Sequence, residues 1–441
     1  MSSHKVLMFG WEFPPHINGG LGVACLGLTK AMAMAGDDIT FVLPKIMDVA
    51  TNEGIDSSHF IFDGAVFSQK LNRTDKEVKI KIHHFDSILT PYLTSKLYAQ
   101  ELGNIVDQKA NSNSESFHDN DNRLVYAPNL VGEVYRYAEV VNKIPDIESF
   151  EIIHCHDWLT VPPALKAKKI TGKPLILHIH ATEFDRTGGW INQEIFEIEK
   201  LGMQNADQII AVSEYTKNSI IQNYSIDPSK ITVIHNGIDY EHHTKNQHTN
   251  PFSTKLMALK NAGYQLVLFT GRLTFQKGVD YLLDAAQKAL KFNNKTLFII
   301  VGSGDMEQKL INQAVDLKIA DRVVFTGFLK GDELQSLYQM ADLFIMPSVS
   351  EPFGLVALES AVHNTPVIIS KQSGVSEVFK NSLKVDFWDT DEMANHIVGV
   401  LEYEALRKTL SNLAHAEAKQ LSWHKAAKKI KNLYHKTIRV N

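Results

Sequence analysis

The chain has 441 residues, of which 44% are hydrophobic and 22% charged, enough apolar material for two or three domains with large cores. Its net charge of −5 at pH 7 comes without a long basic run, so we expect no nucleic acid partner. Two cysteines, Cys25 and Cys155, are too few for a disulfide scaffold and fit a reducing compartment. Because neither a signal peptide nor an apolar run of membrane-spanning length is present, we expect a cytoplasmic protein without stable membrane insertion. The sequence leaves the oligomeric state open.

Short apolar runs alternate with helical patterns in the first half of the chain. Residues 5–10, KVLMFG, predict a buried strand, and a loop rich in glycine and proline connects it to a helix over 21–36. Residues 108–123 have low complexity and predict a mobile surface insertion. Further buried strands are predicted at 150–158, 173–181 and 206–213.

The same alternation restarts in the second half. A strand over 264–272 precedes a helix over 279–292, and further strands are predicted at 296–304, 322–328, 341–348 and 365–370. Strands that are apolar almost throughout, with helices between them, are typical of parallel sheets covered on both faces. The predicted fold is therefore α/β, with two doubly wound, Rossmann-like domains facing across a cleft.

The polar stretch 241–251 marks the expected boundary between the domains. We assign residues 1–248 to the N-terminal domain and 249–423 to the C-terminal domain, and we expect the final helix, 424–441, to pack back on the N-terminal domain. The boundary stretch contains three histidines, which would suit a metal ion. A solvated linker is the better interpretation, because no second group of ligands pairs with them.

Ligands of an open parallel sheet bind outside the carboxyl ends of its strands, and the loop 10–22 lies at such an end. Gly19, Gly20 and Gly22 would let the backbone approach a ligand, and the helix that follows would offer unpaired amides to an anion. The alternative interpretation is a flexible turn without a ligand.

Two further loops could hold an anion. In GRLTFQKG, residues 271–278, Arg272 and Lys277 would stand beside a helix N-terminus, which suits a diphosphate, although such cations are often only solvated. In QSGVSEV, residues 372–378, the free amides of a small-residue loop could receive a phosphate.

The stretch EPFGLVALES places two carboxylates, Glu351 and Glu359, eight residues apart. We expect Pro352 in the first turn of a helix, with Glu351 at the loop edge and Glu359 within the helix. Eight helical residues separate the two carboxylates by about 12 Å along the axis, which is too far for a close acid–base pair. They could instead hold two parts of one long ligand, or they could be exposed polar positions only.

Motifs for metals and common cofactors fit poorly. In GSGDME, Glu307 stands where a dinucleotide fingerprint needs its third glycine, and no GxxxxGK[ST] phosphate loop occurs. The sequence DTD begins at Asp389, but Glu392 three residues later, before an apolar helical run, indicates a helix start. We therefore expect no cofactor and no metal site.

Taken together, GGLG, HCHDW, HATEFDR, VIHNGID, GRLTFQKG, VGSGD, EPFGLVALE and SWHKAAKK closely resemble the retaining GT-B glycosyltransferases, specifically the glycogen synthase-like and family 4 group. The resemblance implies that Glu351 contacts the donor sugar and Glu359 the nucleotide ribose. It also implies that Arg272 and Lys277 neutralise the leaving diphosphate and that His156 contacts the donor hexose. Further expected donor contacts are Gly19, Gly20, Gly22, Gly354, Leu355, Gly374 and Val375.

The implied reaction is the retaining, metal-independent transfer of glucose from UDP- or ADP-glucose to the non-reducing end of an α-1,4-glucan. Family 4 enzymes with other acceptors, such as a lipid, a sugar phosphate or an exopolysaccharide, are the alternative. Many starch-type synthases have lysine where this chain has Ile17 and cysteine where it has Phe353. These differences resemble archaeal-type and family 4 enzymes, so the donor nucleotide stays open. A phosphorylase and a glucan-binding protein without activity are the remaining readings.

Overall fold

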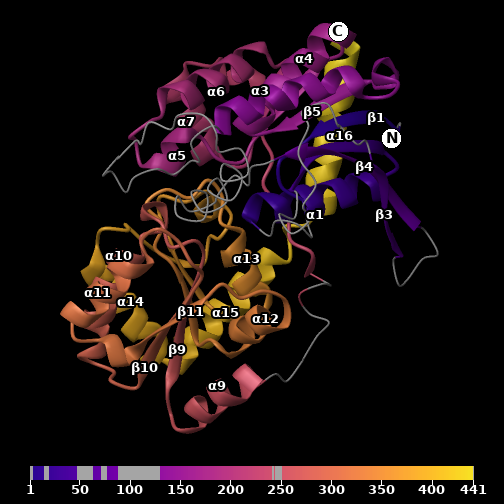
Figure 1. Cartoon of the computed structure of the whole chain (residues 1–441). Helices are drawn as coiled ribbons and strands as arrows, with labels where there is room; N and C mark the ends of the chain where they lie inside the picture. The colour runs from indigo at the N-terminus through magenta and orange to yellow at the C-terminus, as the bar shows by residue number, and fades with distance from the viewer. Residues whose placement is uncertain are drawn as a thin grey trace, which may run out of the picture.

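The computed structural model describes residues 3–13, 19–46, 63–70, 77–87, 130–240, 243 and 251–440. The predicted insertion at 108–123, most of the stretch 241–251, and residues 14–18 of the first glycine loop lie outside this set. The described residues form two sheets, each covered by helices (Figure 1). Within them, no helix is both long and apolar enough to cross a lipid bilayer.

The N-terminal sheet has eight strands in the order β3-β4-β2-β1-β5-β6-β7-β8. The pairings are parallel except for β3, which runs antiparallel to β4 at the edge of the sheet. The strands are β1 (Lys5–Phe9), β2 (Asp38–Ile46), β3 (Asp63–Lys70), β4 (Glu77–Ser87), β5 (Ile152–His156), β6 (Leu175–Ile179), β7 (Gln208–Ala211) and β8 (Ile231–Val233). The helices are α1 (Gly20–Met34), α3 (Leu130–Val140), α4 (Val161–Thr171), α5 (Glu183–Thr187), α6 (Gln193–Asn205) and α7 (Glu214–Tyr224).

The C-terminal sheet has six strands in the order β11-β10-β9-β12-β13-β14, paired in parallel. Its strands are β9 (Gln265–Thr270), β10 (Thr296–Val301), β11 (Val323–Gly327), β12 (Leu343–Met346), β13 (Val367–Ser370) and β14 (Leu383–Val385). Its helices are α9 (Pro251–Asn261), α10 (Val279–Leu290), α11 (Glu307–Asp316), α12 (Gly331–Met340), α13 (Leu355–Val362), α14 (Thr390–Glu402) and α15 (Glu404–Ala418). Asp389 caps α14 by accepting a hydrogen bond from the Glu392 amide, so the predicted helix start is confirmed.

Alternate residues of the central strands pack on opposite faces of each sheet. In β5, Ile153 and Cys155 pack with Ala164 of α4, whereas Ile152 packs with Ala24 of α1. This burial on both faces explains why the strand sequences are apolar almost throughout, and it confirms the predicted pair of Rossmann-like sheets.

The last helix, α16 (Trp423–Val440), lies beside α1 in the N-terminal half of the molecule, and both chain ends lie on that half (Figure 1). Ile430 and Tyr434 of α16 pack into the same core as Leu28 of α1. A parallel bridge between Ile238 and Ser422 accompanies the crossing. The domain limits at 248/249 and 423/424 stay predictions.

A buried ion pair fixes α16 to the turn that follows α1. The Lys431 ammonium lies 3.0 Å from the Asp37 carboxylate, with both side chains at most 2% exposed, and it donates to the Ala35 carbonyl at 2.7 Å. Asp37 also accepts from the His4 amide at 3.1 Å. Removing one partner of such a pair leaves a buried charge without compensation, which is costly.

We predict that Lys431→Met lowers the free energy of unfolding by about 3–5 kcal/mol, because it leaves Asp37 buried without its cation. Lys428→Met is the matched control, since Lys428 is exposed on the same helix; it should change stability by less than about 0.5 kcal/mol. Denaturant unfolding followed by circular dichroism measures both variants. Equal stability of the two would contradict the structural role of the pair.

Candidate active site

Lys277 and Glu351 come together at the carboxyl ends of β9 and β12. The Lys277 ammonium donates to the Glu351 carboxylate at 2.5 Å, and the Ser348 hydroxyl donates to the same oxygen at 3.1 Å. The loop that carries Lys277 needs glycine at its end, because Gly278 has a φ of 63° and an added Cβ would lie 2.1 Å from the Pro347 carbonyl oxygen. The structure thus joins a predicted cation and a predicted carboxylate in one ion pair.

The helix of EPFGLVALES begins at Leu355, so the prediction that Pro352 lies in its first turn is wrong. Gly354 precedes the helix with a φ of 109°, a left-handed conformation that turns the chain into α13. Glu351 therefore lies outside the helix, and the helical separation of about 12 Å predicted for the two carboxylates does not apply. The Pro352 carbonyl instead accepts a hydrogen bond from Ser213 of the N-terminal half at 2.6 Å.

Glu359 lies in α13 and is half-buried. It accepts a hydrogen bond from the Tyr338 hydroxyl at 3.0 Å. Burial and this neighbouring carboxylate raise the pKa of Tyr338 well above its usual value, so the phenol keeps its proton and remains a donor. Leu355, at the start of the same helix, packs against core residues of both halves.

Two of the amides predicted to be free in the loop 372–378, those of Gly374 and Val375, are occupied. The Gly374 amide donates to the Glu351 carbonyl at 2.8 Å, and the Val375 amide donates to the Phe353 carbonyl at 2.7 Å. An isolated parallel bridge also joins Glu351 to Ser373. This loop positions the backbone that carries Glu351, and its role as a phosphate receptor would require these bonds to break.

The first glycine loop contains a carboxyl group that our sequence analysis did not assign. Gly19 caps α1 and Gly20 begins it, but Glu12 is buried beside this helix end, and an added Cβ at Gly19 would lie 2.5 Å from Glu12 Oε2. Burial raises the pKa of Glu12 to about 7, while Arg272 and the Gly22 amide act in the opposite direction. The Gly22 amide therefore already has an acceptor, the Glu12 carboxyl group. The Arg272 guanidinium of the C-terminal half interacts electrostatically with the same carboxyl group of the N-terminal half.

His156 ends β5, and the next residue, Asp157, has an unusual backbone with a φ of 57°. The Asp157 carboxylate accepts from the amides of His180, at 2.6 Å, and Ala181, at 3.3 Å. This contact joins the loop after β5 to the loop after β6. Burial raises the pKa of Asp157 to about 7, with Arg186 and these amides opposing the increase.

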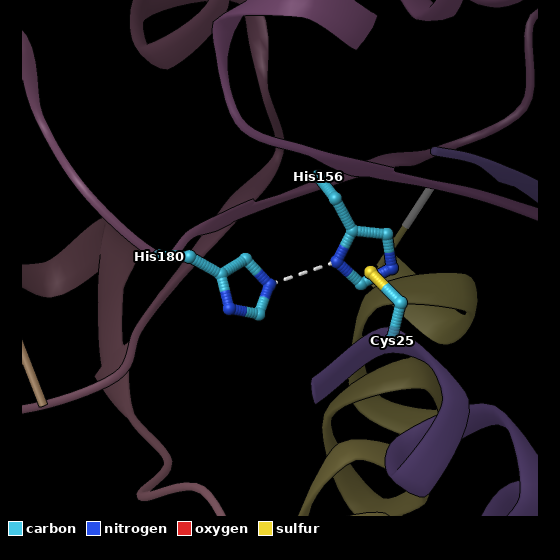
Figure 2. Close-up of side chains that lie close together, drawn as sticks. All are labelled: Cys25, His156 and His180. Carbon is cyan, nitrogen blue, oxygen red and sulfur yellow. Dashed lines mark hydrogen bonds between the residues drawn. The ribbon is translucent and has the colours of Figure 1, made fainter. Parts of the chain in front are cut away.

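The His156 ring lies beside His180, with Nδ1 3.0 Å from His180 Nε2, and Cys25 of α1 projects toward the two rings (Figure 2). The ligand atoms of these three residues lie within 4.8 Å of one another, close enough to hold a metal ion. Burial lowers the pKa of His180 to about 3 and that of His156 well below its usual value.

His156 was predicted from the sequence as a site residue, whereas His180 and Cys25 were not. The available signal was the pattern His-x-His, which occurs in HCHDW and again in HIHA. Side chains two residues apart share one face of a strand, and β5 pairs directly with β6. Finding Cys25 from the sequence would have required knowing which residues of α1 face the sheet.

Several contacts join the two halves next to these loops. The Ser350 hydroxyl donates to the Asp185 carboxylate at 2.6 Å, and the Glu377 carboxylate accepts from the amides of Glu214, at 2.9 Å, and Tyr215, at 2.6 Å. Of the predicted donor-site residues on the C-terminal sheet, Arg272 interacts with Glu12 beside the glycine loop. A ligand held by residues of both halves would bind between them.

Comparison with known proteins gives two family matches and similar curated relatives. The starch synthase catalytic domain family matches residues 5–228, and glycosyl transferases group 1 matches residues 257–435. An uncharacterized glycosyltransferase of Methanocaldococcus jannaschii is 28% identical, over 98% of this chain and 97% of that protein. Glycogen synthase of Mycobacterium tuberculosis is 26% identical, over 86% of this chain and 80% of that protein.

Solved structures share the fold. The catalytic domain of starch synthase IV from Arabidopsis thaliana, bound to ADP and acarbose, has a TM-score of 0.66 and 18% identity, covering 99% of this chain and all of that one. Anabaena HepE in complex with UDP and glucose has a TM-score of 0.66 and 20% identity, covering 98% of this chain and all of that one. These likenesses confirm the GT-B architecture. Since the starch synthase family match covers just over half of the chain, the chain belongs to the glycosyltransferases of the starch synthase catalytic domain family.

Proposed function

We propose that the chain transfers glucose, with retention of configuration, from a nucleotide diphosphate glucose to the non-reducing end of an α-1,4-glucan. The observation that carries the proposal is the Lys277–Glu351 ion pair at the carboxyl ends of β9 and β12, with Lys277 in the same loop as Arg272, which interacts with Glu12 beside the glycine loop. Relatives named glycogen synthase support the choice of acceptor, and a neighbour of the same fold solved with ADP and acarbose supports a nucleoside diphosphate donor.

The hardest step of such a transfer is the departure of the diphosphate, which carries away negative charge. Fixed cations stabilise this charge most strongly in a site shielded from water. Lys277 is held by Glu351 before the donor binds, and Arg272 is exposed at the mouth of the same loop. Both cations are therefore placed to move onto the diphosphate oxygens without a large change of backbone.

The two glutamates would hold different parts of the donor. Glu351 has its backbone fixed by Gly374 and Gln372, so its carboxylate can accept hydrogen bonds from sugar hydroxyls once Lys277 turns toward the diphosphate. Glu359 lies further along, on α13, beside the Tyr338 hydroxyl, where it can accept from the ribose hydroxyls. We assign Glu351 to the sugar and Glu359 to the ribose because the family resemblance implies these contacts and because the two carboxylates have different neighbours.

His156 would contact the hexose as an uncharged group. Because burial holds its pKa well below the usual value, the imidazole is neutral at pH 7 and can exchange hydrogen bonds with hydroxyl groups. Its neighbour His180 fixes one ring nitrogen through the bond of 3.0 Å. This arrangement suits recognition of a neutral sugar rather than of a phosphate.

A second candidate is hexose transfer to another acceptor by the same donor site. D-inositol 3-phosphate glycosyltransferase of Salinispora arenicola is 28% identical, over 66% of this chain and 69% of that protein. An Escherichia coli galactosyltransferase that acts on a GlcNAc-diphosphoundecaprenol is 23% identical, over 81% of this chain and 92% of that protein. The donor chemistry proposed above would be common to both candidates.

Arg272→Ala and Lys277→Ala should each lower the turnover number by about 10²–10³-fold, because each removes a cation that stabilises the leaving diphosphate. Lys291→Ala is the matched control, since Lys291 is exposed at the far end of α10. Steady-state assays with donor and acceptor, after a check of folding by circular dichroism, measure the effect. Near-normal turnover in both variants would refute the assignment of this loop.

Incubation with UDP-, ADP- and GDP-glucose against glycogen, maltooligosaccharides, D-inositol 3-phosphate and a lipid extract tests the acceptor. We expect maltooligosaccharides to grow by single glucose units, with release of the nucleoside diphosphate and an α-linkage in the product. Transfer only to inositol phosphate or lipid would replace the first candidate by the second. Elongation from free glucose 1-phosphate would indicate a phosphorylase instead.

We propose that transfer needs no divalent ion, because Arg272 and Lys277 supply the positive charge that a metal would otherwise bring to the diphosphate. Turnover should therefore stay within about twofold after dialysis against a chelator. The control is a second dialysis that restores magnesium. Loss of activity with the chelator and its recovery with magnesium or manganese would contradict this prediction.

A further inference from the structure

Four histidines form one cluster on the face of the N-terminal sheet that α1 and α16 cover. His154 and His156 of β5 stack with ring centroids 4.6 Å apart, and His178 and His180 stack at 4.2 Å on the neighbouring chain segment. In this cluster His154 Nε2, His156 Nε2 and both ring nitrogens of His178 are buried without a hydrogen-bond partner among the described residues. Buried nitrogens of this kind usually have a partner, so the cluster calls for an explanation.

Two groups of three within this cluster have the spacing of metal ligands: His154, His156 and His178; or Cys25, His156 and His180. The first is completely buried, contains no anionic ligand, and has His154 Nδ1 already bonded to the Tyr434 hydroxyl. The second includes a thiol, and its His180 is partly exposed, whereas all three residues of the first are buried. The second group is the better site.

We propose that Cys25, His156 and His180 bind one thiophilic divalent cation of the zinc class, with the fourth position open. Zinc favours tetrahedral sites made of thiolate and imidazole, and a site with three protein ligands leaves room for water or a hydroxyl group. The Cys25 thiol gives its proton to solvent as the metal–sulfur bond forms.

The geometry needs little change for such an ion. Two imidazole nitrogens on one tetrahedral zinc ion, each at about 2.0–2.1 Å from it, lie about 3.3 Å apart. His156 Nδ1 and His180 Nε2 are 3.0 Å apart, so a small separation of the rings exchanges their hydrogen bond for two metal bonds (Figure 2). Cys25 completes the group from α1, with its sulfur within 4.8 Å of one ring nitrogen of each histidine.

The local charge also suits a cation. Burial, and then the carboxyl groups of Glu12 and Asp157, raise the pKa of the Cys25 thiol well above its usual value, so the metal would have to displace this proton and the two carboxyl groups lie near the proposed ion. A thiolate with these two carboxyl groups would offset the charge of a buried dication, which is otherwise costly to remove from water.

Metal binding has a consequence that rests on the proposed function. His156 is the residue proposed to contact the donor hexose, so an ion on its Nδ1 would compete with the donor. The cation would then act as an inhibitor, in accord with a transfer reaction that needs no metal.

Cobalt tests the binding without any assay of activity. Co²⁺ added to the chelator-treated full-length protein should bind with one equivalent per chain and give a thiolate-to-cobalt charge-transfer band, which Zn²⁺ should abolish. The chain has two cysteines, so the band can arise only from Cys25 or Cys155. Absence of the band would overturn the proposal.

The variants identify which cysteine is responsible. Cys25→Ser should lose the band, whereas Cys155→Ser should keep it, because Cys155 packs in the core on the other face of the sheet. His180→Ala should also lose the band at equimolar cobalt, and it serves as a second test if Cys25→Ser does not fold. A band that survives in Cys25→Ser or disappears in Cys155→Ser would refute the site.

Kinetics test the consequence separately. Zn²⁺ should raise the KM for the donor in the wild type and in Cys155→Ser, but not in Cys25→Ser, each measured against the metal-free rate of the same variant. A cobalt band without this competition would keep the metal site and refute the inhibition. An inactive protein that still gives the band would count against the proposed function and not against the site.

Discussion

The ion pair between Lys277 and Glu351 is the interaction on which the proposed donor site depends. It joins the loop after β9 to the loop after β12, at neighbouring strand ends of one sheet. A lysine that already has a partner is held in place, and the ligand that replaces its partner does not have to order it again. The pair thus keeps a cation at the place where the proposed reaction develops negative charge.

Backbone contacts hold this pair in position. The Glu351 backbone accepts from the Gly374 amide and donates to the Gln372 carbonyl, and Ser213 of the opposite half bonds to the next carbonyl, that of Pro352. The two halves therefore meet through the segment that carries the carboxylate. A movement of the halves relative to each other would therefore change the position of Glu351 directly.

Much of the fold could be predicted from the sequence because its signals are local. Strands such as LVLF in β9 are apolar throughout, since helices cover both faces of the sheet, and Asp389 is followed by the glutamate that marks a helix start. Five of the described strands were not predicted, namely β2, β4, β8, β14 and the antiparallel edge strand β3, whose residues show no clear apolar pattern. Within the site, the wrong predictions all involve contacts between distant segments.

Three examples show this dependence. Pro352 has the usual character of a first-turn residue, but the helix begins at Leu355 after its N-cap Gly354, and the Pro352 carbonyl accepts a hydrogen bond from Ser213. The Gly374 amide, which was predicted to be free, donates to the carbonyl of Glu351, more than twenty residues away in sequence. Glu12 and Cys25 could be identified as site residues only from the structure. It places Glu12 near Arg272 and Cys25 near His156.

The most direct test of the proposed donor site is a crystal structure with the nucleoside diphosphate glucose that best supports transfer. We expect the diphosphate oxygens to lie within hydrogen-bond distance of Arg272 and Lys277, Lys277 to have left Glu351, and the ribose to contact Glu359. A nucleotide bound elsewhere, or a bound donor with the Lys277–Glu351 pair intact and the diphosphate away from both cations, would contradict the proposed site.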